Sequence, residues 1–184
     1  MRHATILDRQ HAALLVIDIQ DRIHVVMRYR EEVENNTHKL IRGFQLLHLP
    51  ILLTEQYPKG LGHTISSLRY TLQATLPIQK MTFSCRGCDE LMRTLEEKRI
   101  HQVVLAGIET HVCVLQTALD LMANHYQVHV VRDAVSSRHD LDHQTALQRL
   151  AQAGAIITTT EAVLFELLGR ADTPEFKEVS KLLK

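Results

Sequence analysis

The sequence predicts an α/β protein: a doubly wound, six-stranded parallel sheet with helices on both faces, an α/β/α sandwich. Short apolar runs alternate with longer segments whose apolar residues recur at helical spacing, which is typical of repeated βαβ units. Several runs, such as LLVI, ILL and VVLA, are apolar without a polar residue at every second position. This pattern indicates strands buried on both faces, as in a parallel sheet covered by helices.

The first half of the chain supplies three strands and two helices. AALLVIDI is an unbroken apolar run that ends in an acid, and Pro50 opens the next strand, PILLT. Between them, apolar residues are spaced as on one face of a helix. The predicted strands cover 12–19, 50–54 and 76–80, and the predicted helices cover 31–48 and 64–73.

The second half repeats this alternation. Apolar strand runs such as HQVVLAG and AIITTT are separated by amphipathic segments, and glycines lie near several of the expected ends. Strands are predicted over 101–107, 126–133 and 155–160, and helices over 88–99, 111–124 and 142–153, then up to Leu168 and again from Pro174.

Length and composition favour one globular domain over residues 1–184. The hydrophobic fraction is 45%, and 21 basic residues balance 21 acidic ones, so no basic surplus points to nucleic acid. No run is long enough to span a membrane, and the first residues lack the apolar core of a secretory signal. We therefore expect a cytoplasmic protein.

Three cysteines argue against a disulfide scaffold, and the 12 histidines are scattered along the chain.

Three of the predicted strands lead into a chemically reactive residue. Asp18 ends the first strand, Lys80 ends the third, and the fourth continues through GIET to Cys113. The carboxyl ends of parallel strands meet at one edge of the sheet, where ligands bind. A buried carboxylate is costly without a partner, so an acid and a lysine at the same edge are expected to neutralise each other.

These residue types suit the hydrolysis of an amide. With Thr110 as a possible helix cap, Cys113 falls in the first turn of the helix, where the helix dipole and Lys80 favour a thiolate. Asp18 can accept the thiol proton and later protonate the leaving amine. Cys113 can attack the carbonyl carbon and form a thioester, with backbone N–H groups holding the oxyanion.

The segments LLVIDIQD, IQKMTFS and VVLAGIETHVCVLQTALDL resemble the isochorismatase-like cysteine hydrolase superfamily, and the resemblance continues through YQVHVVRDAVSS. Its marks are D-x-Q after the first strand, a lysine after the third, and G-x-x-T-x-x-C-V after the fourth. The resemblance implies the doubly wound sheet and an Asp–Lys–Cys triad at Asp18, Lys80 and Cys113. It also implies a cis peptide at Ile108–Glu109, with the amides of Glu109 and Cys113 forming the oxyanion hole.

The sequence departs from some branches of this superfamily. Nicotinamidases bind a metal through an Asp and two His after the second strand, whereas the loop here reads TEQYPKGLGH. We therefore expect no metal, no other cofactor and a substrate other than nicotinamide. True isochorismatases cleave a vinyl ether without needing the cysteine. The resemblance is closest to isochorismatase-domain hydrolases of unassigned substrate, and it implies a homo-oligomer, a dimer or larger.

Four further residues near the predicted site are candidates for lining the pocket: Gln20, Tyr57, Phe83 and His111. Gln20, two residues after Asp18, is expected to form supporting hydrogen bonds rather than to act as a catalyst. Side chains two apart on a helix point in different directions, so His111 is not expected to pair with Cys113. Cys85 and Cys88 are read as two ordinary thiols, with Cys85 near enough to the pocket to be oxidised there.

The sequence therefore predicts an enzyme, a cysteine hydrolase acting on a small-molecule amide or related C–N bond. Two alternatives stay open. One is vinyl ether hydrolysis with Asp18 as general acid, which would not need Cys113. The other is a non-catalytic, oligomeric thiol sensor or interaction protein that keeps the fold and a reactive cysteine.

Overall fold

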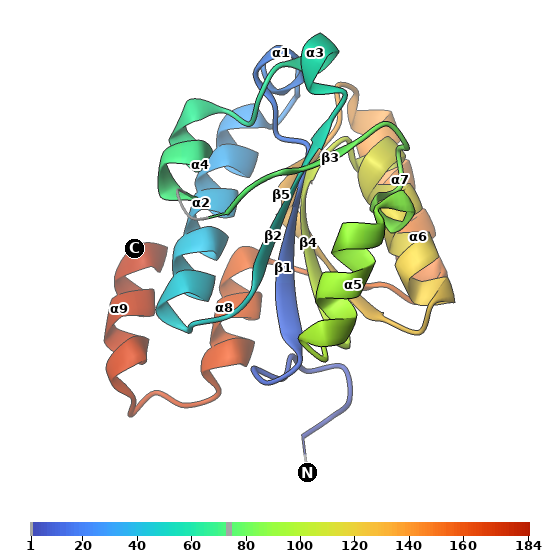
Figure 1. Ribbon diagram of the computed structural model, residues 1–184. Coiled ribbons are helices and arrows are strands. Elements are labelled where there is room, and N and C mark those ends of the chain that lie inside the picture. Colours follow the sequence, from blue (N-terminus) through green and yellow to red (C-terminus); the bar gives the residue numbers. More distant parts are fainter. Residues whose placement is uncertain (1, 73–74) are drawn as a thin grey trace.

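The computed structural model describes residues 2–72 and 75–184 and confirms the predicted α/β/α architecture. One six-stranded sheet crosses the molecule, every strand pair in it is parallel, and helices pack on both of its faces (Figure 1). The strand order is β3-β2-β1-β4-β5-β6. The strands are β1 Ala12–Ile17, β2 Ile51–Gln56, β3 Ile78–Lys80, β4 Gln102–Ile108, β5 Gln127–Ser136 and β6 Ile156–Thr158.

The helices divide into two layers. In Figure 1, α2, α4, α8 and α9 cover one face, and α5, α6 and α7 cover the other. The short helices α1 and α3 lie at the end where the strands finish. The helices are α1 Asp21–His24, α2 Arg30–Leu46, α3 Pro58–Leu61, α4 Ser66–Thr71, α5 Asp89–Glu97, α6 Leu115–Ala123, α7 Asp140–Gln152, α8 Thr160–Leu168 and α9 Pro174–Leu183.

Each face of the sheet has its own apolar core. Phe44 of α2 and Leu164 of α8 belong to the core on one face, whereas Leu91 of α5 and Leu121 of α6 belong to the other. Successive residues of β1 point alternately into the two cores, and the whole strand is buried. This double burial explains why the strands read as continuous apolar runs rather than as alternating ones.

The order of the strands reverses between β1 and β4. From β1 the chain proceeds outward to β2 and β3 on one side, then returns to β4 and proceeds outward to β5 and β6 on the other. The two central strands are in register from Ala12 opposite Gln102 to Ile17 opposite Gly107. Their carboxyl ends therefore lie at the switch point, where open α/β sheets bind ligands.

Several predicted boundaries differ from the observed ones. The helix expected over 64–73 is shorter, Ser66–Thr71, and its last predicted position lies outside the described residues. β5 runs three residues beyond its predicted end, and β6 keeps only three residues. Helices α1 and α3 were not predicted; each has only four residues, too few for an apolar periodicity to be read. Within the described residues, no helix combines the length and apolar character needed to cross a membrane.

Candidate active site

A buried ion pair lies at the carboxyl edge of the sheet. Lys80, the last residue of β3, donates from Nζ to Oδ2 of Asp18 at 2.6 Å, and the two side chains are 1% and 4% exposed. Asp18 follows β1 directly, in a left-handed conformation with φ of 53°. This conformation turns the chain sharply, so that the Gln20 amide donates to the Asp18 carbonyl at 2.8 Å. Lys80 reaches Asp18 from two strands away, past the end of β2.

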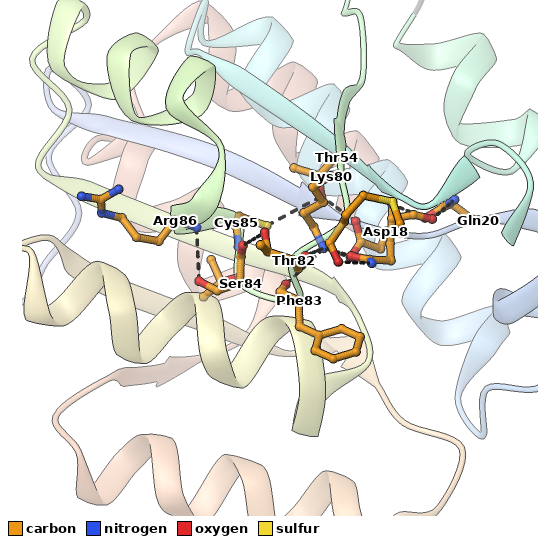
Figure 2. A network of polar contacts seen from close by, with 12 residues as sticks. Asp18, Gln20, Thr54, Lys80, Thr82, Phe83, Ser84, Cys85 and Arg86 are labelled. Atoms are coloured by element: carbon orange, nitrogen blue, oxygen red, sulfur yellow. Dashed lines mark hydrogen bonds and ion pairs between the residues drawn. The ribbon is translucent and has the colours of Figure 1, made fainter. Parts of the chain in front are cut away.

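The Lys80 ammonium has further acceptors around it. Besides Asp18, Nζ lies 2.8 Å from Oε1 of Gln56, 3.1 Å from the Phe83 carbonyl and 3.2 Å from the Thr82 carbonyl. Figure 2 shows Lys80 between Asp18 and the loop that carries Thr82 and Phe83. The cation is therefore held by one carboxylate and three neutral oxygens, with almost no contact with solvent.

The second oxygen of Asp18 is held by β2. Thr54 donates from its hydroxyl to Oδ1 of Asp18 at 2.8 Å, and the same hydroxyl lies 3.8 Å from the sulfur of Cys85. Because the Thr54 hydrogen is used on Asp18, the Cys85 thiol is the donor in the second contact. Both carboxylate oxygens of Asp18 thus have a fixed partner, which orients the group.

Cys113 does not lie in the first turn of a regular α-helix. Residues Thr110–Val114 form a π-type turn that continues into α6. The Glu109 carbonyl accepts from the amides of Val112 and Val114, on either side of Cys113, and not from the Cys113 amide. The expected helix cap at Thr110 is also wrong: its hydroxyl lies 2.9 Å from Nδ1 of His143 on α7 instead.

The electrostatic balance at Cys113 differs from the expectation of a resting thiolate. Burial raises the pKa of the Cys113 thiol, the negative charge of Asp18 raises it further, and Lys80 lowers it only in part. Burial alone would lower the pKa of Lys80, but the Asp18 carboxylate beside it leaves that pKa raised. The prediction of a thiolate is therefore wrong because the lysine charge is already paired with Asp18.

The segment before Cys113 has an unusual backbone. The Ile108–Glu109 peptide is cis, at the bond to which the family resemblance assigns a cis peptide. The Glu109 side chain turns away from the strand and accepts from the amide and Nε of Arg138, both at 3.1 Å. Arg138 follows β5, so this ion pair ties the β4–α6 connection to the neighbouring strand end.

The candidates for pocket lining are distributed around this edge. Gln20 is fully buried and supports β2: its side chain accepts from the Gln56 amide at 2.7 Å and donates to the Gln56 carbonyl at 3.0 Å. Tyr57 and Phe83 are 46% and 53% exposed. His111 is partly exposed, with Nδ1 2.9 Å from the hydroxyl of Ser137. Contact of these residues with a substrate stays a prediction.

Thr54 and Gln56 are the site residues that the sequence analysis missed. Both belong to β2, and they alternate with Glu55, which points to the other face of the sheet. Three consecutive polar residues, TEQ, at the end of a strand that begins with ILL are the signal that could have identified them, because alternate residues of a strand point to the same face. Because β2 pairs with β1, which leads directly into Asp18, this signal would also have placed Thr54 and Gln56 at the carboxyl edge of the sheet.

Glu55 of β2 and His63 of the loop that follows form an acid–histidine pair that the sequence analysis did not identify. Oε2 of the buried Glu55 lies 3.2 Å from Nδ1 of His63, and its other oxygen accepts from the amide and hydroxyl of Thr64. In the described part of the chain, no three histidine, cysteine or acidic side chains converge in a way that could hold a metal ion. Glu55 anchors the loop.

The three cysteines are all buried and free. Cys85 lies at the same carboxyl edge of the sheet, because it contacts Thr54 and its amide donates to the Thr117 hydroxyl at 2.9 Å. Burial raises the pKa of Cys85 to about 12 and also raises that of Cys88. Neither is activated as a thiolate.

Comparisons with known proteins agree with the fold and identify the family. A family model described as Isochorismatase domain matches residues 12–162. Isochorismatase domain-containing protein 1 of Danio rerio is 42% identical over 168 residues, which cover 91% of this chain and 59% of that protein. Isochorismatase domain-containing protein 2A of Mus musculus is 38% identical over 176 residues, covering 95% of this chain and 84% of that protein.

Solved structures show the same architecture. The structure of MAR1 ribonuclease from Caenorhabditis elegans superimposes with a TM-score of 0.92 at 42% identity, and the match covers 96% of this chain and 91% of that one. The chain thus spans most of some relatives, but only about three fifths of others, such as the Danio rerio protein.

Proposed function

Because this chain belongs to the isochorismatase-like hydrolase family, we propose that it is a cysteine hydrolase that cleaves a small amide or a related C–N bond. Asp18, Lys80 and Cys113 are the catalytic triad of this proposal. The observation that carries it is the fully buried Asp18–Lys80 pair at the switch point, because its charges act directly on the Cys113 thiol. A buried ion pair with a perturbed thiol beside it is characteristic of a functional site.

The reaction begins from a neutral thiol. As the Cys113 sulfur attacks the carbonyl carbon, its proton passes to the Asp18 carboxylate. The C–N bond then breaks, Asp18 returns the proton to the leaving nitrogen, and a thioester is left on Cys113. Asp18 next takes a proton from water, whose oxygen attacks the thioester and releases a carboxylic acid and the thiol. Lys80 remains a cation throughout and keeps Asp18 ionised between proton transfers.

The oxyanion of the tetrahedral intermediate needs hydrogen-bond donors. We assign this role to the backbone amides of Glu109 and Cys113. The π-type turn supports the assignment, since the Glu109 carbonyl bonds the amides on either side of Cys113 and not the Cys113 amide itself. Turns of this kind are frequent at functional sites. Losing one such donor typically slows turnover by about 100- to 1000-fold.

Trapping of the acyl-enzyme tests the proposal. The wild-type protein is incubated with a panel of small amides and examined by intact-protein mass spectrometry, with tryptic mapping of any adduct. We expect a thioester on Cys113 and loss of turnover in Cys113→Ala and Cys113→Ser, with both variants retaining the wild-type circular dichroism spectrum. Wild-type turnover in Cys113→Ala would contradict covalent catalysis.

The same experiment separates the two alternatives. Vinyl ether hydrolysis would survive in Cys113→Ala but not in Asp18→Asn, because Asp18 is then the general acid. A thiol sensor would form no adduct with any amide, yet peroxide would modify Cys113. Since a structural relative bears the name ribonuclease, an RNA substrate is included; the balanced formal charge leads us to expect no Cys113-dependent cleavage of RNA.

The proposal extends to the setting in which the enzyme works. We propose that residues 1–184 form one domain, that the substrate is a small molecule, and that the protein is a cytoplasmic homo-oligomer. The chain spans 59% of the first curated relatives that it matches, so activities and partners of those whole proteins are not transferred to it.

A further inference from the structure

The donors of Lys80 are fully used within the protein. An ammonium group carries three N–H donors, and Nζ of Lys80 faces four acceptors: the Asp18 carboxylate, the Gln56 side-chain oxygen, and the Phe83 and Thr82 carbonyls. No donor is left over for a substrate or for the Cys113 sulfur. The lysine therefore acts on the thiol through its charge, and that effect depends on where the charge is held.

Gln56 is the neutral side chain among these four acceptors, two of which are backbone carbonyls. Its Oε1 accepts from Lys80 at 2.8 Å, and its Nε2 donates to the Met81 carbonyl at 3.0 Å. One side chain thus contacts both Lys80 and the residue after it. Gln56 is itself held in place, because the Gln20 side chain bonds both its amide and its carbonyl at 2.7 and 3.0 Å.

The register of the sheet makes this arrangement rigid. Gln56 and Lys80 are opposite each other in the pairing of β2 with β3, and the Tyr57 amide donates to the Lys80 carbonyl at 2.9 Å. Gln56 is 9% exposed and Gln20 is fully buried, so water does not compete for these bonds. The path Gln20–Gln56–Lys80–Asp18 is continuous and buried.

We propose that Gln56 is a positioning residue, which fixes the Lys80 ammonium relative to Asp18 and Cys113 and fixes the loop from Met81 to Phe83 beside it. This inference rests on the proposed role of Cys113 as the nucleophile. Gln56 contacts neither the reacting atoms nor, in this proposal, the substrate. Its effect passes through Lys80, whose charge stabilises the Cys113 thiolate.

The test measures how fast iodoacetamide alkylates Cys113 at about pH 9, by peptide mass spectrometry, in Gln56→Met and Gln56→Glu. Met has the length of Gln but can form neither the hydrogen bond to the Lys80 ammonium nor the one to the Met81 carbonyl. Glu keeps the oxygen that accepts from Lys80 and adds a negative charge. Where the thiolate is the minor species, a rise of one unit in its pKa slows alkylation about tenfold. We expect the rates to fall in the order wild type, Gln56→Met, Gln56→Glu, with a loss of about tenfold in the last.

A purely structural role gives the opposite sign. If Gln56 only supports packing, its replacement loosens the edge of the sheet, exposes Cys113 and speeds alkylation. Wild-type or faster alkylation in Gln56→Met would overturn the proposal, whatever the rate in Gln56→Glu, because the added charge of Glu slows alkylation by itself. Gln45→Met is the matched control, because Gln45 also donates to a backbone carbonyl, that of Thr71 at 2.8 Å, on a helix outside the site; its alkylation rate should equal that of the wild type.

The two hypotheses fail separately. Alkylation requires no turnover, so an absent acyl-enzyme with the expected order of alkylation rates contradicts the hydrolase and not the role of Gln56. If Gln56→Met does not fold, Gln56→Leu replaces it, because Leu also lacks the bonds to Lys80 and to the Met81 carbonyl and adds no charge.

Discussion

Asp18 and Lys80 tolerate burial only as a pair. Their charged atoms are 2.6 Å apart and their side chains almost fully buried. Removing one partner from a buried pair leaves an uncompensated charge and typically costs about 3–5 kcal/mol, whereas neutralising both is much less costly. The pair is thus a structural feature as well as a part of the proposed catalytic triad.

We predict that Lys80→Met lowers the free energy of unfolding by about 3 kcal/mol or more, because Asp18 is left buried without its counter-charge. Asp18→Asn introduced into that variant should recover part of the loss, since no buried charge then remains. Urea unfolding of the wild type, the two single variants and the double variant measures the coupling. Strict additivity of the two single effects would contradict a direct interaction.

At this scale the sequence predicts the charged residues better than the neutral ones. Asp18 and Lys80 are conspicuous because each follows an apolar run, and the convergence of strand ends brings them together. Thr54 and Gln56 are not conspicuous, since Thr and Gln are ordinary at the end of a strand. Their importance comes from pairing across strands, which depends on a register that one sequence does not contain. The state of Cys113 was missed because it depends on the sum of burial and two opposite charges.

At the scale of elements, the close approach of β4 to β1 brings together the two strand ends that lead to Asp18 and Cys113. Gly107 is opposite Ile17, has a φ of +130°, and a Cβ added to it would lie 2.1 Å from the Ile17 carbonyl oxygen. Ile17 directly precedes Asp18. A side chain at position 107 would therefore displace the backbone that holds the proposed general base.

We predict that Gly107→Ala destabilises the protein and slows any Cys113-dependent turnover, because the added methyl group collides with backbone that cannot rotate away. Gly154→Ala is the matched control: its φ is also positive, +99°, but nothing lies within 4 Å of the added Cβ. The control should show only the conformational penalty, about 1–2 kcal/mol. Thermal melts compare the two, and an equal loss in both would contradict the close-approach argument.

The helix after β4 shows why an element can be predicted correctly in kind and wrongly in detail. Apolar periodicity places a helix over 111–124, and α6 does begin nearby at Leu115. The π-type turn before it inserts one residue into the helical spacing, a change that the apolar pattern is too coarse to detect. The bond from Thr110 to His143 is long-range, so the local sequence could suggest only a cap.

At the scale of the whole molecule, the alternation of apolar strands and amphipathic helices was enough to predict six parallel strands between two helical layers. The outer surface is harder to predict, because an exposed apolar side chain has no distinct signature in the sequence. Val25, Val26, Met81 and Phe83 follow β1 or β3 at the carboxyl edge, and their exposed fractions are 56%, 53%, 70% and 53%. Scattered exposed apolar residues are common, but these four all belong to the segments that follow the carboxyl ends of β1 and β3.

We predict that a second copy of this chain covers this edge and that the protein is a homo-oligomer. Burying an apolar side chain of this size contributes about 1.5–3 kcal/mol, and the balanced formal charge leaves little repulsion between copies. Light scattering after size exclusion should give a mass that is a multiple of that of one chain. Met81→Glu should reduce this mass, because it places a charge in the interface, whereas Leu76→Glu, at a position that is 87% exposed before β3, should not. A monomer at every concentration tested would contradict the prediction, as would an equal effect of the two substitutions.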